Sequence, residues 1–382
     1  MKPEGEGSFS FLGLRTNDAR EAGRFRAPIA PATGVDFRSN DYLGLRRHPE
    51  VIEAAAKALR DYGAGAGASR LLGGDHATVR ELEDELTKLK GCAKTAVFPS
   101  GYSANVGLLS ALAREDDGIW SDELNHASIV DGCRLARGVK HVYPHRDIDS
   151  LDKSLSRNRA KFGLALIVTE SVFSMDGDLC DLRGLRECAA RHDAMLIVDE
   201  AHSTGVLPPR GFGVHEYVGL DVGRDVIVGT LSKALGAQGG FVSGPAEVIE
   251  NLFNFSRAMI FSTAIAPVLA GAALAAVRLI SSGRASVANL RANCELAASL
   301  LTSIGIPADS ASPIFPVVVN TEDRAVAAAR ALEERGYSVG AVRPPSVPVG
   351  GSRLRITISA LHTKAEIEGL TQSLSSVLGG AR

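Results

Sequence analysis

The sequence predicts an α/β fold, with a large, doubly wound, mostly parallel sheet and a smaller α+β C-terminal domain. Short apolar runs alternate with amphipathic helical segments through the first two thirds of the chain. This alternation is typical of a parallel sheet covered by helices on both faces. The last hundred residues change to strands and helices in another order, which indicates a separate small domain.

Five apolar runs are the predicted strands of the large sheet, and amphipathic segments at 76–91 and 181–193 are predicted helices beside them. The strands are expected at 95–100, 164–170, 194–200, 225–230 and 239–244. An alanine-rich apolar segment near 263–282 is too short to span a membrane and is interrupted by Pro267. We expect it to be a buried helix that bridges the two domains.

The closing elements predict a compact α+β unit. Strands are expected at 312–320, 337–342 and 352–360, with helices at 321–336 and 363–378. The predicted organisation therefore has four parts: 1–44, an N-terminal segment that packs with the small domain or a partner subunit; 45–250, the large domain; 251–285, the bridging helix; and 286–382, the small domain.

Composition excludes several classes of function. The formal net charge of −2 argues against a broad nucleic-acid surface, which would need a basic excess. Five cysteines form no CxxC pair, as expected for free thiols in a reducing compartment such as the cytoplasm. The N-terminus carries acidic residues early and lacks the continuous apolar run of a signal peptide. No HExxH or Cys/His cluster predicts a metal, and no membrane partner is expected.

Polar residues follow several of the predicted strands, where ligands collect in open α/β sheets. Each alone has an ordinary interpretation: an aspartate as a helix cap, a histidine in a loop, a lysine on the surface. Together they predict one site, because the carboxyl ends of parallel strands meet at one edge. The residues are Ser100, Gly101, Glu170, Asp199, Glu200, His202, Thr230, Ser232 and Lys233.

Pyridoxal phosphate would use each kind of group in this set. Its aldehyde needs an amine, and burial would lower the pKa of Lys233 toward a useful value. Its ring nitrogen needs an anion such as Asp199 to stay protonated, which makes the ring an electron sink. Its phosphate favours the free N–H groups of a helix start. The competing glycine-rich run at 63–74 follows a helical segment, so the strand of a dinucleotide fingerprint is absent.

Several motifs in order carry a resemblance to a known family. They include "SNDYLGL", "SRLLGGDHATVRELEDELTKLKG", "FPSGYSANVGLLSAL", "SDELNHASIVDGCRLA", "TESVFSMDGDLCDL", "VDEAHSTGVLPPRGFG", "TLSKALGAQGG" and "FSTAIAP". From 39–45 to 353–362 the chain resembles the α-oxoamine synthases, a branch of the fold-type I pyridoxal-phosphate enzymes.

The resemblance implies roles for individual residues. Lys233 would hold the cofactor and then act as the base, Asp199 would pair with the ring nitrogen, and His126 would stack over the ring. His202, helped by Ser174, would bond the phenolic oxygen. The phosphate contacts would be Gly101, Tyr102, Thr230 and Ser232, joined by Ser262 and Thr263 from a second subunit.

The resemblance also implies how substrate is bound. Arg355 would bind the amino-acid carboxylate as a bidentate fork, with Arg343 and Arg353 as neighbouring alternatives. Asn40 would contact substrate across a subunit interface. For Arg70 an ion-pair role is favoured over a substrate contact.

The implied activity is a decarboxylative condensation of an amino acid with an acyl thioester in a homodimer. The stretch "VRPPSVPVGGSRLRIT" favours L-alanine and a pimeloyl thioester, as in biotin synthesis. A member using glycine or serine with another acyl chain is the alternative. Coenzyme A and acyl carrier protein both stay open as the acyl donor. The "VGGS" before "RLRIT" departs from the Ala-Gly-Thr often found in this subfamily.

Overall fold

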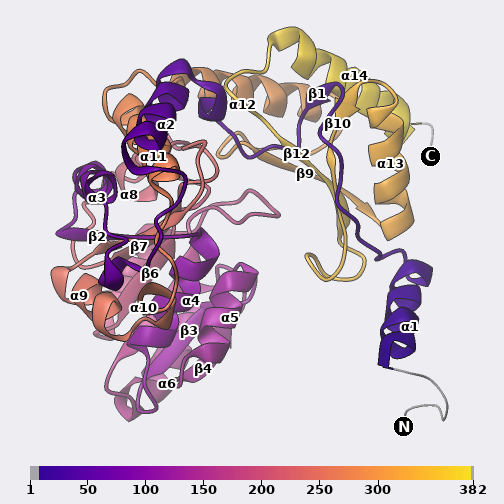
Figure 1. Cartoon of the computed structure of the whole chain (residues 1–382). Coiled ribbons are helices and arrows are strands. Elements are labelled where there is room, and N and C mark those ends of the chain that lie inside the picture. The colour runs from indigo at the N-terminus through magenta and orange to yellow at the C-terminus, as the bar shows by residue number, and fades with distance from the viewer. Residues whose placement is uncertain (1–7, 380–382) are drawn as a thin grey trace.

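The computed structural model describes residues 8–379, and its largest element is a seven-stranded sheet ordered β2-β8-β7-β6-β5-β3-β4 (Figure 1). β8 runs antiparallel to both of its neighbours, whereas the other neighbouring pairs are parallel. The strands are β2 (Lys94–Phe98), β3 (Gly118–Asp122), β4 (Val139–Tyr143), β5 (Ala165–Glu170), β6 (Met195–Asp199), β7 (Val226–Thr230) and β8 (Gly240–Gly244). The predicted doubly wound, mostly parallel sheet is confirmed.

Two hydrophobic cores lie on opposite faces of this sheet, because successive strand side chains point to opposite faces. In β5, Ile167 packs into one core and Leu166 and Val168 into the other. In β7, Ile227 and Val228 divide in the same way. The helices on the first face are α3 (Ala77–Lys90), α6 (Ile148–Asn158), α7 (Leu182–Arg191) and α11 (Pro267–Ser281), and those on the second are α4 (Gly101–Leu112), α5 (Ala127–Leu135) and α9 (Ala246–Phe255).

β3 and β4 are not among the predicted strands. β4 is an edge strand whose side chains are mostly exposed, so its sequence "VKHVY" lacks a continuous apolar run. β3, "GIWSD", is fully buried but ends in polar residues. The five runs that were predicted are apolar because helices cover both faces of their strands.

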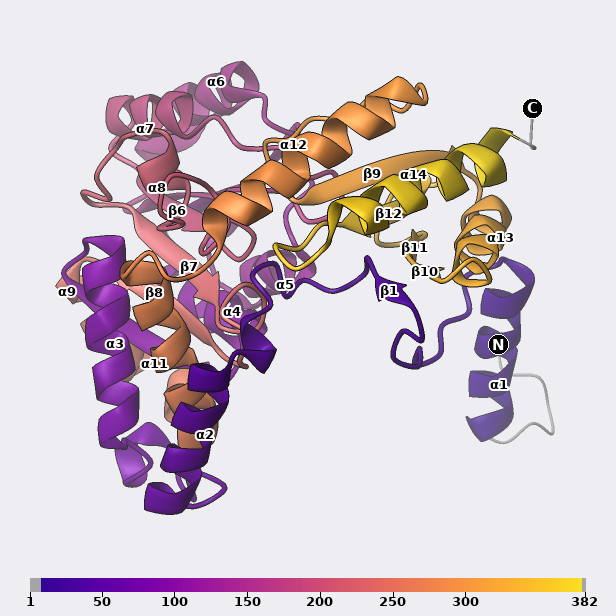
Figure 2. The same cartoon turned by 90° about the horizontal axis from the view of Figure 1, so that it is seen from above.

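The position of α11 differs from the sequence-based expectation of a bridging helix at 251–285. That range contains α9, α10 (Arg257–Ile260) and α11, and α11 packs along α2 (Pro49–Tyr62) and α3 beside the large sheet. The next helix, α12 (Val287–Ser303), extends from the large sheet toward the small one and packs on α14 (Lys364–Gly379) (Figure 2). The small alanine and glycine residues of α11 allow it to pack closely on α2 and α3.

The small part contains an antiparallel sheet of β9 (Ile314–Asn320), β12 (Ser352–Thr357) and β11 (Gly340–Val342), with α13 (Glu322–Glu333) and α14 beside it. β1 (Val35–Asp36) pairs in parallel with β10 (Tyr337–Ser338), so the N-terminal segment contacts this part. α1 (Ser8–Glu21) precedes it, and residues 1–7 of the predicted segment 1–44 lie outside the described residues. The four predicted domain boundaries stay a proposal.

Short elements connect these parts. They are α8 (Val214–Tyr217) and the 3-10 turns Leu45–Arg47, Arg70–Leu72 and Arg159–Lys161. Within residues 8–379, no helix is both long and apolar enough to cross a membrane.

The reversed strand β8 brings Gly240 against the start of α4. A Cβ built on Gly240 would lie 2.5 Å from both the Gly101 nitrogen and the Ser100 oxygen. We expect Gly240→Ala to lower the free energy of unfolding by about 1–3 kcal/mol, because these contacts are backbone atoms that cannot turn away. Urea unfolding measures the change. Gly244→Ala, on the same strand with no contact under 3.3 Å, is the matched control and should lose much less.

Candidate active site

Lys233 lies in the turn that follows β7, at the carboxyl edge of the large sheet. The turn is closed by backbone hydrogen bonds from Gly236 N to Lys233 O at 2.9 Å and from Ala237 N to Leu231 O at 2.9 Å. The Lys233 Nζ lies 2.7 Å from His202 Nε2. Burial lowers the pKa of Lys233 to about 8, although Asp199 and Glu170 oppose the shift. A share of the amine is therefore neutral, and nucleophilic, near physiological pH.

His202 sits in a helical turn directly after β6. Burial, together with the positive charges of Lys233 and Arg355, holds the pKa of His202 well below its usual range, so the imidazole is neutral. Its Nδ1 lies 2.6 Å from the Tyr42 hydroxyl, which lies 3.2 Å from Asn40 Oδ1. With Lys233 donating to Nε2, the Nδ1–H donates to Tyr42, and Tyr42 donates to Asn40.

Asp199 ends β6 and has a donor on each oxygen. Oδ1 accepts from Ala201 N at 2.8 Å, and Oδ2 accepts from Asn105 Nδ2 at 2.7 Å. Asn105 also donates to Ser128 Oγ at 2.9 Å, and this hydroxyl lies 2.8 Å from His126 Nδ1. The chain of bonds fixes the carboxylate relative to the imidazole that is predicted to stack on the cofactor.

Glu170 ends β5, and its backbone pairs with Asp199 across the two strands. Burial and the nearby Asp199 charge raise the pKa of Glu170 to about 8, so its carboxyl carries a proton at neutral pH. Within residues 8–379, its Oε1 has no hydrogen-bond partner. A buried polar atom without a partner is unusual away from a ligand site.

The start of α4 supplies donors for an anion. Ser100 caps the helix by accepting from Ser103 N at 3.0 Å, and the first-turn N–H groups of Gly101 and Tyr102 have no helical acceptor. Thr230 Oγ1 lies 2.6 Å from Ser232 Oγ, beside Gly101. These groups form the predicted phosphate cradle. The Tyr102 hydroxyl itself points to Asp131.

Arg355 is buried in β12 and reaches toward the same site. Its Nε donates to Ser174 O at 2.7 Å, and NH1 donates to Asn40 Oδ1 at 3.1 Å and to Thr357 Oγ1 at 2.9 Å. Among the described residues no carboxylate lies within ion-pair distance of Arg355. A buried guanidinium surrounded only by neutral oxygens can accept an anion from a ligand.

The other predicted contacts lie elsewhere or have other partners. Arg353 forms an ion pair with Asp176. Arg343 donates to Gly23 O at 2.8 Å and to Phe25 O at 3.4 Å. Arg70 is paired with Glu83 and Asp75, as expected of an ion-pair residue.

Ser262 and Thr263 lie in the loop before α11, where Thr263 bridges to Ser69. This loop is at the protein surface, and their predicted phosphate contacts across a subunit interface stay a prediction. The same holds for the individual roles of the other predicted site residues.

Tyr42, Asn105 and Ser128 join this network but are not among the residues predicted from the sequence. Tyr42 comes from a loop before the sheet, and Asn105 and Ser128 come from helices. A polar Asn105 inside the apolar run of "GYSANVGLL" is the one signal that could have indicated its role.

Asp152, Cys188 and His192 form a cluster whose donor atoms lie within 4.8 Å of one another in the described part of the chain. Arg191 donates to the same Asp152 oxygen at 2.7 Å, and His192 Nε2 lies 3.0 Å from it. The Arg191 guanidinium therefore already pairs with the one carboxylate of this cluster.

The residues at the sheet edge fit pyridoxal phosphate. A cavity of about 360 Å³ opens beside Lys233. The amine, the Asp199 carboxylate and the start of α4 are each placed at this edge, and the neighbouring Asn105 Oδ1 and Glu170 Oε1 are buried without a partner inside the described chain. The cavity is lined by Ser39, Asn40, Asp41, Arg46, Ser232, Lys233, Gly236 and Ala237.

Comparison with known families agrees with this geometry. The family model described as aminotransferase class I and II matches residues 32–374. The chain belongs to this family. It is 46% identical to the 8-amino-7-oxononanoate synthase of Anaeromyxobacter dehalogenans (strain 2CP-1), over 97% of this chain and 96% of that protein. It is 44% identical to the enzyme of the same name from Mycolicibacterium smegmatis, over 96% and 95%.

Solved structures show the same fold. Serine palmitoyltransferase from S. paucimobilis with a bound PLP-myriocin aldimine superposes with a TM-score of 0.90 at 29% identity, over 97% of this chain and 98% of that one. The 8-amino-7-oxononanoate synthase of Francisella tularensis gives a TM-score of 0.78 at 26% identity, over 91% and 99%. The predicted fold class is confirmed.

The buried Glu170 predicts a pH-dependent stability in the cofactor-free protein. Its folded pKa of about 8 lies above its ordinary value of 4.5, so its contribution to stability is present below pH 4.5 and is lost as pH rises to 8. Glu170→Gln should therefore gain stability relative to wild type across this interval, by at most about 1.4 kcal/mol per pH unit. Urea unfolding at several pH values measures the difference. Glu187→Gln, at an exposed position on α7, controls for the change in net charge; an equal gain there would contradict the assignment.

Proposed function

We propose that this chain catalyses the pyridoxal-phosphate-dependent condensation of L-alanine with a pimeloyl thioester in biotin biosynthesis. The products are 8-amino-7-oxononanoate, carbon dioxide and the free thiol. The names of the relatives at 44–46% identity support this acyl transfer. The PLP-containing structural neighbour supports the cofactor.

One observation carries the proposal most directly: a buried arginine that has no acidic partner among residues 8–379 is linked to an amine of lowered pKa. Arg355 and Lys233 are joined through Asn40, Tyr42 and His202 by contacts of 3.1, 3.2, 2.6 and 2.7 Å. An α-amino acid presents a carboxylate that Arg355 can bind and an α-proton that the Lys233 amine can accept. The site is therefore suited to binding an amino acid and fixing its orientation.

Each residue has a definite task in this function. When bound, pyridoxal phosphate supplies an electron sink for the pair of electrons left at the substrate α-carbon. Lys233 removes the proton from that carbon, and its lowered pKa leaves a neutral share of amine able to accept it. Asp199 keeps a negative charge at the ring nitrogen, and the Asn105 donor holds its orientation. Arg355 binds the substrate carboxylate.

A second candidate is condensation of serine with a different acyl thioester. The structural similarity to serine palmitoyltransferase, with a TM-score of 0.90, favours this possibility. Proton exchange at the α-carbon separates the two. Purified protein loaded with pyridoxal phosphate is incubated in D₂O with L-alanine, L-serine or glycine. Faster exchange of alanine, and carbon dioxide release that depends on a pimeloyl thioester, support the first candidate.

The assembly and the location are parts of the same proposal. A homodimer would bring Ser262 and Thr263 of one subunit to the phosphate of the other. Either coenzyme A or acyl carrier protein would carry the acyl group, and the protein would act in the cytoplasm. Comparison of the two acyl carriers as substrates decides between the donors.

Arg355→Lys should lower kcat/KM for the amino acid by about 10²–10³-fold, because a bidentate contact to the carboxylate is lost. Arg353→Lys is the matched control on the same strand, since a lysine can still pair with Asp176. Steady-state kinetics measure both. A larger loss of kcat/KM in Arg353→Lys, or in Arg343→Lys, would show that this arginine, and not Arg355, binds the carboxylate.

Lys233→Ala should abolish turnover and covalent capture of the cofactor. Borohydride reduction of wild type should attach the cofactor to the peptide that contains Lys233, and mass spectrometry measures the added mass. The variant should bind the cofactor only reversibly. Turnover that persisted in Lys233→Ala would exclude the lysine as the base.

A further inference from the structure

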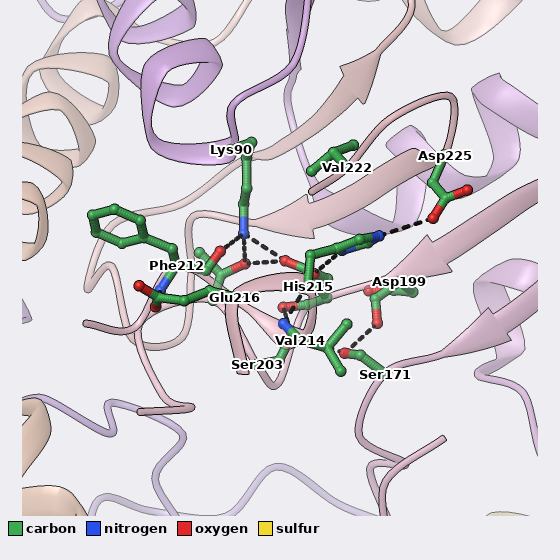
Figure 3. Close-up of polar contacts among 12 residues, drawn as sticks. Lys90, Ser171, Asp199, Ser203, Phe212, Val214, His215, Glu216, Val222 and Asp225 are labelled. Carbon is green, nitrogen blue, oxygen red and sulfur yellow. Dashed lines mark hydrogen bonds and ion pairs between the residues drawn. The ribbon is translucent and has the colours of Figure 1, made fainter. Parts of the chain in front are cut away.

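A row of alternating charges, largely buried, lies close to the carboxyl end of β6 (Figure 3). Asp225 Oδ2 accepts from Arg186 NH2 at 2.6 Å and lies 3.1 Å from His215 Nε2. His215 Nδ1 lies 2.9 Å from Glu200 Oε1, and Glu200 Oε2 accepts from Lys90 Nζ at 2.5 Å. None of these five residues contributes to the predicted mechanism.

Lys90 is the last residue in this row of charges, and each proton of its ammonium group has a hydrogen-bond acceptor. Besides Glu200, it donates to Thr204 Oγ1 at 2.7 Å and to Phe212 O at 2.6 Å. An ammonium has three protons, and three acceptors take them. The side chain is 1% exposed, and that of Glu200 is 0% exposed. The three acceptors and the surrounding burial therefore fix the position of the Lys90 ammonium group.

Two of the three acceptors stand at the ends of the turn that carries His202. Glu200 begins the turn and Thr204 ends it, and Thr204 N donates to Glu200 O at 3.0 Å. His202 lies between them and meets Lys233 at 2.7 Å. A single amine on α3 thus bonds both ends of the turn that presents the imidazole.

Asp199 and Glu200, at the end of β6, bond to helices on opposite faces of the sheet. Asp199 bonds Asn105 on α4, whereas Glu200 bonds Lys90 on α3. The Asp199 carbonyl accepts from Ser171 Oγ at 2.8 Å, and Ser171 Oγ lies 2.9 Å from Ser203 Oγ in the same turn (Figure 3). The strand end is held from both sides of the sheet.

We propose that Lys90 is a positioning residue of the active site: by bonding Glu200 and Thr204 at once, it holds the turn that presents His202 to Lys233 and to the cofactor. Buried ion pairs are often replaced by apolar side chains without loss of stability. A pair retained only for stability would therefore tolerate replacement of both partners by neutral side chains, whereas a positioning pair would not.

The test uses Lys90→Met together with the double variant Lys90→Met/Glu200→Gln. The double variant leaves no unpaired buried charge at this point, so it keeps the test valid if the single variant fails to fold. The proposal rests on the proposed function of the site, because two of its measurements use bound pyridoxal phosphate. In the double variant we expect kcat to fall about tenfold to hundredfold with KM changed far less.

The visible absorbance of the bound cofactor is the second measurement, made without substrate. We expect the pH midpoint of its absorbance change to move by about one pH unit, because His202 no longer has a fixed place beside Lys233. The third measurement needs no cofactor: the imidazole ¹⁵N chemical shifts of His202, assigned with His202→Gln. In wild type they should report one neutral tautomer, and in the double variant an average of two.

Two variants of α3 are the controls. Lys88→Met makes the same substitution at an exposed lysine two residues away, and Leu86→Ala removes a fully buried side chain from the same helix. Both should keep the wild-type absorbance midpoint and His202 shifts, although Leu86→Ala should lose stability. Wild-type midpoint, kcat and shifts in the double variant would overturn the proposal, and so would equal changes in Leu86→Ala.

The outcomes also separate this inference from the proposed function. If wild type failed to bind pyridoxal phosphate or to exchange the alanine α-proton, the proposed function would fall. The His202 chemical shifts of the cofactor-free protein would still decide whether Lys90 positions the imidazole.

Discussion

The 2.7 Å contact between Lys233 Nζ and His202 Nε2 is the interaction on which the site depends. Burial lowers the pKa of both groups, so that His202 is neutral and a share of the Lys233 amine is neutral near physiological pH. The positive charge of Lys233 lowers the pKa of His202 further. Asp199 and Glu170 oppose the shift at the lysine, which keeps its pKa near 8. The balance leaves an amine that can both accept and release a proton.

This balance requires that the ends of three parallel strands meet at one edge. β5, β6 and β7 run in parallel and deliver Glu170, Asp199 and Lys233 from neighbouring positions. β8 reverses direction between β7 and β2, and Gly240 allows the start of α4 to approach. The anion-binding end of α4 and the amine after β7 are thereby placed beside each other. The small antiparallel sheet adds Arg355 from the opposite side.

Local pattern was sufficient for the strands whose residues form a continuous apolar run, whereas the buried strand β3, "GIWSD", was missed because it ends in polar residues. The five apolar strands could be predicted because their side chains pack into two cores, whereas the exposed edge strand β4 has no such pattern. The packing of α11 on α2 and α3 could not be predicted, because an alanine-rich helix can pack against any neighbouring helix and its sequence does not specify which one. Tyr42 and Asn105 could not be predicted from strand ends, since they reach the site from a loop and from a helix.

The sequence by itself determined the doubly wound α/β fold and the polar residues expected at one edge of its sheet, because apolar runs that end in polar residues define both. The further cofactor and substrate contacts, among them His126, Ser174 and Arg355, were implied by the resemblance of the motifs to a known family. Only the tertiary structure decided which candidate arginine is buried without an acidic partner among residues 8–379, that Lys90 is buried behind β6, and how Tyr42 links His202 to Asn40. These contacts join residues far apart in the chain. Charge, burial and pKa depend on what surrounds a group in space, and a linear pattern does not contain that information.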